Sequence, residues 1–369
     1  ISRGDWSSDV CSSDLACKPR LPALQLGMQI RDAAGCPLIL DIDDHELSFF
    51  ANRDPITMEQ FEAVQPGEWA NHVEPYGEEW TRLCEGLTGT ADRILVSNTA
   101  LQKRFGGVVV PHVRDESAFQ PVDASARVAV RNRFGVPIDA RVVLFFGTPR
   151  LHKGIGELAA AVAAIDDPRV RLVIIGDAPD KSVTAKLNQI APGRVIQIPG
   201  QPFSAIPTIM ALGDVVALPQ DVDHPISQFQ LPAKAIDAIA AGLPLLVTPT
   251  PPLMDLVSAG LAVPFEPKGL KDAIVAALNK PVTPESQAAV RERFLRGYSY
   301  LSAGESLRKI IGEAVAQKPS EAAVGSGTRL VAAQYRALGC EPPQPSKTLP
   351  EQGRDIVMFW KQNDSALYG

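Results

Sequence analysis

The sequence predicts an α/β protein built from two doubly wound domains, in which helices cover both faces of parallel sheets. Between residues 126 and 280, short continuous apolar segments alternate with amphipathic segments of helical length. The same alternation is less complete between residues 16 and 111. Continuous apolar strands joined by helices are typical of parallel sheets that are buried on both faces. We therefore expect one complete domain over 126–280 and one incomplete domain over 16–111.

The alternation sets the expected elements of the 126–280 domain. Its strands are expected at 142–146, 170–175, 195–198, 215–218, 245–247 and 261–263. Helices should connect these strands, for example at 154–165 and 232–241, and two more should follow at 283–297 and 304–316. The helices within 281–317 are expected to pack back towards the first domain.

The first domain is expected to hold fewer elements. Its helices should form at 21–34, at 78–87 and after Asn98, which can cap a short helix. Its strands should form at 38–40, 93–97 and 108–111, with an irregular segment at 51–72. The strand at 38–40 leads into an acidic cluster that comprises Asp41, Asp43, Asp44 and Glu46.

The two ends of the chain are expected to lie outside these domains. Residues 1–15 show no helical or strand periodicity and resemble a translated sequencing adapter, so we exclude them from the fold. Residues 318–354 are rich in Pro, Gly, Ser and Glu, which predicts a linker. Residues 355–369 begin with an apolar strand and resemble the start of a second unit. We therefore expect the chain to be a fragment of a longer protein.

Composition argues against several classes of protein. The net charge of −6 over 369 residues provides no basic field, so no nucleic-acid partner is expected. The five cysteines form no Cys-x-x-Cys pair, which indicates a reducing, cytoplasmic setting. No apolar run reaches the ~18–20 residues that a transmembrane helix needs.

Glycines and two cations follow the first strand of the 126–280 domain. Gly147, Arg150, Lys153 and Gly154 lie between this strand and the next helix. Ligands of open α/β sheets bind beyond the carboxyl ends of the strands, with phosphate often at a helix N-terminus. Gly147 lets the backbone approach a ligand, and both cations add to the positive end of the helix dipole. The alternative is that Arg150 and Lys153 are ordinary solvated loop residues.

A second candidate lies on the helix expected at 232–241. Lys234 and Asp237 are three residues apart and therefore share one face of the helix. They could form an exposed ion pair, which would contribute only about 0.2–0.5 kcal/mol. Alternatively, the Asp237 carboxylate accepts hydrogen bonds from neighbouring hydroxyls of a sugar.

These segments resemble those of retaining GT-B glycosyltransferases of the group 1 type, which use nucleotide sugars, and the resemblance covers residues 36–315. In that family a Gly-x-x-x-x-x-Lys-Gly segment holds the donor diphosphate. It matches Gly147, Lys153 and Gly154 here, with Arg150 nearer to the lysine than is usual. The family's Glu-Ala-Met-Ala-x-Gly-x-Pro segment matches residues 237–244, so Asp237 takes the place of the ribose-binding glutamate.

Two positions depart from the family pattern. An earlier glutamate that helps to hold the transferred sugar is absent, and Ser227 and Gln228 lie in its neighbourhood. A histidine near the reaction centre is replaced, by position, by Asp43. The resemblance implies that no metal or other cofactor is needed, whereas the acidic cluster by itself could bind Mg²⁺. Residues 112–125 are expected to form the hinge between the two domains.

The resemblance implies an enzyme of the hexosyltransferase type, with two domains facing across a cleft. It would move a sugar from a nucleotide-diphosphate sugar to a glycan or lipid-linked acceptor, with retention, as in bacterial polysaccharide biosynthesis. The implied catalytic residues are Asp43, Arg150 and Lys153, and the implied donor-binding residues are Gly147, Arg150, Lys153, Gly154, Ser227, Gln228 and Asp237.

The resemblance also bears on location and partners. It allows peripheral association with the inner face of the membrane, and a tandem glycosyltransferase domain after residue 355. Two alternatives stay open: a non-catalytic GT-B module in a multidomain protein, and a GT-B nucleotide-sugar epimerase.

Overall fold

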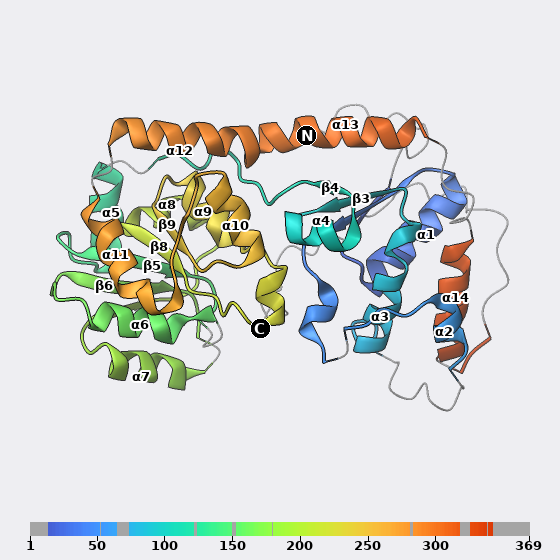
Figure 1. Cartoon of the computed structure of the whole chain (residues 1–369), viewed down its shortest axis with the longest axis horizontal. Helices are drawn as coiled ribbons and strands as arrows, with labels where there is room; N and C mark the ends of the chain where they lie inside the picture. Colours follow the sequence, from blue (N-terminus) through green and yellow to red (C-terminus); the bar gives the residue numbers. More distant parts are fainter. Residues whose placement is uncertain are drawn as a thin grey trace. The chain divides into compact units, whose positions relative to one another are not determined.

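The computed structural model describes most of the chain as two compact units. The described residues are 14–51, 53–64, 74–121, 124–149, 153–178, 180–280, 283–317, 325–337 and 339–341. Of these, the residues within 14–110 and 306–341 form unit 1, and those within 111–305 form unit 2. Figure 1 shows that each unit consists of a sheet with helices around it.

Unit 2 is built on a six-stranded parallel sheet with the strand order β10-β9-β8-β5-β6-β7. Its strands are β5 (Arg141–Phe146), β6 (Val170–Ile175), β7 (Val195–Ile198), β8 (Val215–Leu218), β9 (Leu245–Val247) and β10 (Val263–Pro264). The bounds predicted for β6, β7, β8 and β9 are confirmed residue for residue.

Helices connect and follow these strands. They are α5 (Ala124–Phe134), α6 (Ile155–Ala163), α7 (Lys181–Ile190), α8 (Ile206–Ile209), α9 (Ala233–Ala240), α10 (Pro251–Ser258), α11 (Leu270–Asn279), α12 (Pro284–Gly297) and α13 (Tyr300–Val315). The short 3-10 helices are η5 (Phe203–Ala205), η6 (Met210–Leu212), η7 (Pro225–Gln228) and η8 (Pro267–Gly269).

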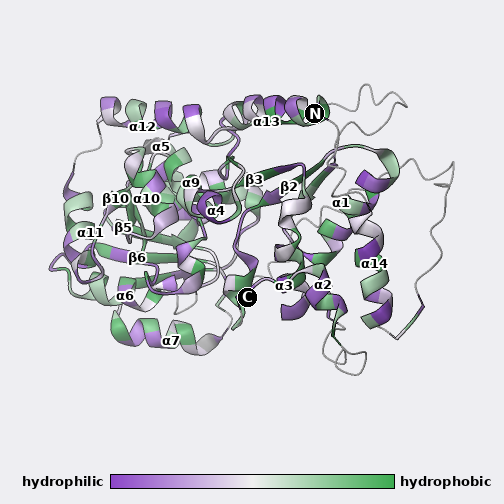
Figure 2. Cartoon of the chain, turned by 45° about the vertical axis from the view of Figure 1, so that its right-hand side comes forward, coloured by the Kyte–Doolittle hydropathy of each residue, from purple (hydrophilic) through white to green (hydrophobic). Residues whose placement is uncertain are grey.

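Both faces of the larger sheet are buried. In β5, Val142, Leu144 and Phe146 belong to one hydrophobic cluster with residues of α9, while Val143 and Phe145 belong to another with residues of α6. Successive side chains of a strand point to opposite faces, so a strand covered on both sides must be apolar throughout. Figure 2 shows β5 as mainly hydrophobic, whereas α6 and α7 mix hydrophobic and hydrophilic residues.

The direction of strand addition reverses between β5 and β8. From β5 the chain proceeds through β6 to β7 on one side, and it then returns to place β8 on the other side of β5. β5 and β8 are parallel, with Leu144 paired to Val216, so the loops after both strands leave from the same edge. Doubly wound sheets bind ligands at such a switch point. The carboxyl ends of β5 and β8 are therefore the place where a site is expected.

Unit 1 contains a four-stranded parallel sheet with the order β1-β2-β3-β4. Its strands are β1 (Asp14–Cys17), β2 (Leu38–Ile42), β3 (Arg93–Val96) and β4 (Val108–Val109). Its helices are α1 (Leu21–Ala34), α2 (Met58–Glu62), α3 (Glu78–Gly86), α4 (Thr99–Phe105) and α14 (Ser326–Ala337), with the 3-10 helices η1 (Glu46–Phe49) and η3 (Thr88–Thr90). The end of α13 also belongs here, where Ile310 and Ala314 pack against Ile39 and Leu95.

Strand β1 corrects the exclusion of residues 1–15 from the fold. Its first two residues pair with Leu38 and Ile39 of β2, while residues 1–13 lie outside the described part of the chain. A short edge strand is held mainly by backbone hydrogen bonds to its neighbour. Only Ala16 of its four residues is buried, so the strand has little hydrophobic pattern of its own.

Helix α14 corrects the prediction of a linker over 318–354. Leu330 and Ala333, three residues apart, are buried on one face of the helix, which packs against α1. The backbone N–H of Gly327 donates a 3.2 Å hydrogen bond to Asp32 of α1. The Pro, Gly and Ser content of the whole stretch concealed this short amphipathic helix.

The remaining predictions for unit 1 have mixed outcomes. The helix over 21–34 is confirmed as α1, and Asn98 caps α4 as expected. The segment 51–72 is not wholly irregular, because it contains α2, which begins with a capping box. The strand and second unit expected at 355–369 lie outside the described residues. In the part of the chain that the structure describes, no helix is both long and apolar enough to span a membrane.

Candidate functional site

The loop after β5 begins with a glycine that leaves its backbone open to a ligand. Gly147 has a φ of +100°, which L side chains rarely adopt. Its N–H donates a 2.8 Å hydrogen bond to the carbonyl oxygen of Ile175 in β6. A Cβ built on Gly147 would lie 3.8 Å from Nζ of Lys234. The open backbone thus lies directly beside an ammonium group.

Gly154 holds the loop after β5 against the loop after β8. It has a φ of +72°, and a Cβ built on it would lie 2.1 Å from the carbonyl oxygen of Pro219. Only glycine fits here without a shift of the backbone. The contact places Lys153, which precedes the N-cap residue Gly154 of α6, at the switch point of the sheet. Arg150, between the two glycines, lies outside the described residues.

Lys234 brings a second ammonium group to the same edge of the sheet. It lies in the first turn of α9, and its Nζ is 4.3 Å from the centroid of the buried Phe145 ring, which is a cation–π distance. Burial lowers the pKa of Lys234 to about 7; the charge of Lys153 lowers it as well, and Asp237 opposes the shift. Lys153 and Lys234 are therefore close enough for each to repel the charge of the other.

Asp237 lies inside unit 2 rather than on an exposed helix face. It is 4% exposed, and its Oδ1 accepts a hydrogen bond from Nε of Arg114 within an ion pair. Arg114 also donates a 3.2 Å hydrogen bond to the carbonyl oxygen of Ala233 at the start of α9. Burial raises the pKa of Asp237, and the charges of Arg114 and Lys234 oppose this shift. The interpretation of Lys234 and Asp237 as an exposed ion pair is therefore wrong, because Asp237 is buried and pairs with Arg114.

Ser227 and Gln228 both lie in η7, which packs against α10. Ser227 is buried, and the side-chain amide of Gln228 donates to the carbonyl oxygen of Val222. These contacts shape the loop after β8. A donor-binding role for either residue stays a prediction.

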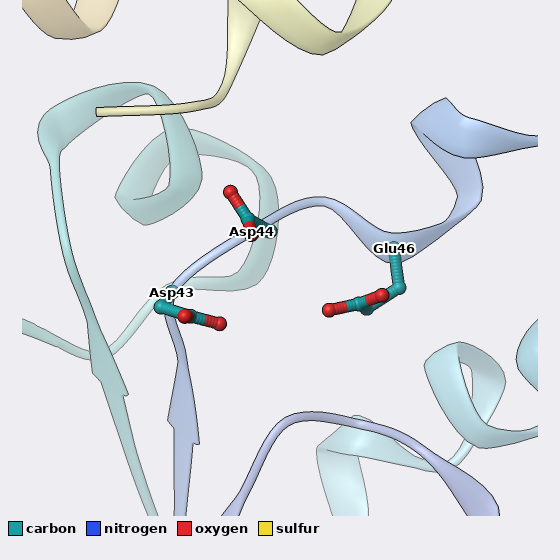
Figure 3. Close-up of side chains that lie close together, drawn as sticks. All are labelled: Asp43, Asp44 and Glu46. Carbon is teal, nitrogen blue, oxygen red and sulfur yellow. The ribbon is translucent and has the colours of Figure 1, made fainter. Parts of the chain in front are cut away.

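The acidic cluster of unit 1 surrounds a lysine of the same unit. Figure 3 shows the carboxylates of Asp43, Asp44 and Glu46 close together after β2. Nζ of Lys18 lies 3.1 Å from Asp43, 3.3 Å from Asp44 and 3.0 Å from Glu46. Nε of Arg20 donates a 2.7 Å hydrogen bond to Glu46. Two cations of the chain itself thus counter the charge of the cluster.

These carboxylates do not suit a metal ion while Lys18 stays in place. Calcium needs oxygen ligands at about 2.3–2.6 Å, and the ammonium group occupies the position from which all three carboxylates are reached. The prediction that no metal is needed stays a prediction, as does a catalytic role for Asp43. Burial and the charge of Asp43 raise the pKa of Asp41 to about 6, and Lys18 opposes this shift.

Three residues in these arrangements were not recognised from the sequence. Arg114 lies 123 residues before Asp237 in the segment expected to be a hinge, so no local spacing connects them. Lys18 follows a strand that was partly excluded from the fold. The sequence predicts no role for Lys234 beyond an ion pair, because its contact with Phe145 depends on the packing of α9 against the sheet.

The chain that carries this sheet, its lysines and its glycine turns is similar to known glycosyltransferases. Residues 140–280 match the family described as glycosyl transferases group 1. TuaC of Bacillus subtilis (strain 168), named as a teichuronic acid biosynthesis glycosyltransferase, is 25% identical over 188 residues, which are 49% of this chain and 45% of TuaC. A D-inositol 3-phosphate glycosyltransferase of Kineococcus radiotolerans is 29% identical over 263 residues, which are 63% of this chain and 59% of that protein.

Solved structures extend the similarity to the fold of both units. Anabaena HepE, crystallised in complex with UDP, matches with a TM-score of 0.61 at 18% identity, over 81% of this chain and 79% of HepE. The chain thus has the two-domain, Rossmann-like GT-B fold that was expected. It spans about half the length of the curated relatives it matches.

Proposed function

We propose that this chain belongs to an enzyme that transfers a sugar from a nucleotide-diphosphate sugar, of the hexosyltransferase type. The observation that supports this most is the pair of lysines, Lys153 and Lys234, beside the open backbone of Gly147. They lie at the switch point of the sheet that matches the group 1 family. Ammonium groups suit phosphate oxygens, and the bare Gly147 backbone leaves room for a phosphate beside them. UDP, with which HepE was crystallised, is a nucleoside diphosphate and thus carries the phosphate groups that the proposal requires.

Lys153 has a direct role in this proposal. When the bond between the sugar and the diphosphate breaks, negative charge develops on the departing phosphate. A fixed ammonium group at that position lowers the energy of the transition state more than that of the ground state. Gly154 holds Lys153 there, and Arg150 would add a second charge.

The finer features of the reaction are proposed from the sequence resemblance. They are retention of configuration, a glycan or lipid-linked acceptor, and a role for Asp43 near the reaction centre. No metal or other cofactor is proposed. A cytoplasmic setting at the inner face of the membrane, and a tandem glycosyltransferase domain, belong to the same proposal.

Lys153→Ala is expected to weaken binding of a nucleoside diphosphate to the full chain about tenfold to hundredfold. The reason is that a hydrogen bond to a charged group contributes about 1.5–3 kcal/mol. Titration calorimetry with UDP, GDP and ADP measures the change, and Lys186→Ala on the exposed face of α7 is the matched control. Equal affinities of wild type and Lys153→Ala would remove this lysine from the site.

Product analysis then separates the proposed reaction from its alternatives. The full chain is incubated with the sugar nucleotide whose base binds best, with and without a glycan acceptor. Transferred or released sugar together with free nucleoside diphosphate supports a transferase. An epimerised nucleotide sugar would support the epimerase, and unchanged donor would support a non-catalytic module.

Asp237 is proposed to hold the ribose with its second carboxylate oxygen, because Arg114 occupies only Oδ1. Wild type should then bind a ribose nucleotide about tenfold more tightly than its 2′-deoxy counterpart. Asp237→Asn should shrink this ratio, since a neutral amide oxygen accepts hydrogen bonds less strongly. The ratio compares two ligands on one variant, so a general loss of stability cancels. An unchanged ratio would contradict a ribose contact.

A further inference from the structure

Lys234 lies where its own helix disfavours a positive charge. It is the second residue of α9, and the N-terminal end of a helix carries a partial positive charge. Its Nζ lies over the ring of Phe145 and beside Gly147, within the field of Lys153. The Phe145 ring offers only a weak substitute for a counter-ion.

Within α9, Asp237 is the negative charge that acts on Lys234. Asp237, one turn further along, is already paired with Arg114. β9, β5 and α12 pack against α9. β9 has no titratable side chain, and β5 contributes the apolar Val142, Leu144 and Phe146 to the shared cluster. From α12, Arg291 reaches α9 only at its far end, at the carbonyl oxygen of Ala240. Among the described residues, no carboxylate lies within ion-pair distance of Lys234.

We propose that Lys234 is a second diphosphate-binding cation of the site, and that nucleotide binding transfers a proton from the solvent to its side chain. This inference rests on the proposed function, because it requires a nucleoside diphosphate next to Lys153 and Lys234. The diphosphate would supply the direct ion-pair partner that Asp237, which is paired with Arg114, does not provide. Binding and protonation would then favour each other.

The direction of the resulting pH dependence follows from the charge of Lys234 in the two states. In the free chain its pKa is lowered to about 7, so it is mostly neutral at pH 8. A bound diphosphate raises this pKa, because a nearby negative charge favours the ammonium form. Binding is therefore strongest below pH 7 and weakens as the pH rises from 7 towards the pKa of the complex. The terminal phosphate, with a second pKa of about 6, is already ionised in this range and does not cancel the effect.

Proton uptake can be measured directly by calorimetry. The full chain is titrated at pH 8 with the tightest of UDP, GDP and ADP, in two buffers that differ in ionisation enthalpy. Wild type should take up about 0.9 proton for each nucleotide bound, and its affinity should fall about tenfold between pH 7 and pH 8.5. Lys234→Arg keeps a charge at every pH, so it should bind without uptake and without this loss.

Two further variants make the test decisive. Lys234→Met should lose the uptake and also bind about tenfold more weakly at pH 7, and it replaces Lys234→Arg if that variant does not fold. Lys186→Arg, on the exposed face of α7, should behave as wild type. Wild type that binds without uptake, or equal uptake by Lys234→Arg, would overturn the role of Lys234 and leave the proposed function intact. If folded wild type binds none of the three nucleotides, both proposals fail.

Discussion

Replacing Lys18 by alanine is expected to lower the free energy of unfolding by about 3 kcal/mol at neutral pH, as removal of one member of a buried ion pair does. The carboxylates of Asp43, Asp44 and Glu46 would then repel each other without the ammonium group between them. Asp44 and Glu46 are buried, so water cannot fully replace the ammonium group of Lys18 as their partner. The φ of +70° at Lys18 adds little to the difference, because alanine would bear the same strain. Urea denaturation measures the loss.

Two comparisons test this explanation. Lys103→Ala, on the exposed surface of α4, should change the stability by less than about 1 kcal/mol. Millimolar Ca²⁺ should restore stability to Lys18→Ala but not affect wild type, because only the variant has room for a cation among its carboxylates. A small loss in Lys18→Ala, together with no response to Ca²⁺, would show that solvent rather than Lys18 balances the cluster.

Arg114→Met should lower the free energy of unfolding by about 3–5 kcal/mol, because it leaves the buried Asp237 carboxylate without its counter-charge. Arg296→Met is a matched control, since it removes the same groups from an exposed pair with Glu292 on α12. An exposed pair of this kind contributes about 0.3–0.5 kcal/mol. Similar losses in the two variants would contradict the importance of burial at Asp237.

The loss in Arg114→Met should also depend on pH. Burial raises the pKa of Asp237 in the folded chain, and Arg114 opposes that shift, so the variant should raise this pKa further. A protonated Asp237 needs no counter-charge, so its contribution to the stability of the variant is present at low pH. This contribution is lost as the pH rises through the pKa of Asp237 in the folded variant. The gap between wild type and variant should therefore be largest at pH 8 and shrink towards pH 4. A gap independent of pH would indicate that lost packing, rather than charge, explains the destabilisation.

The sequence predicted the larger sheet well because each of its strands is marked by the residues of that strand alone. The strands of unit 2 are mainly apolar, with Arg141, Arg171 and Gln197 as polar exceptions, and buried strands of this kind are recognisable from their own residues. Strand β1 and helix α14 were missed for a different reason. β1 depends on pairing with β2, and α14 depends on its contact with α1 through Gly327. Neither partner is close in sequence, so no local pattern shows the contact.

The candidate site was only partly predictable on the same physical grounds. Gly147, Lys153 and Gly154 follow one strand in order, and their common position was expected from spacing alone. The partners of Asp237 and Lys234 were not, because Arg114 and Phe145 reach them through the tertiary fold. The difference between an exposed helical pair and a buried one cannot be read from a separation of three residues. It depends on what packs against α9.

Burial and the acidic cluster of unit 1 act together on a neighbouring thiol. Cys17 ends β1, immediately before Lys18, and it lies at the surface. Partial burial of its sulfur, together with the charges of Asp41 and Asp43, raises the pKa of the thiol to about 11, and Lys18 opposes the shift only in part. The thiolate is the form that attacks disulfides and is oxidised by peroxides. Cys17 is therefore a surface cysteine that stays protonated and unreactive at neutral pH.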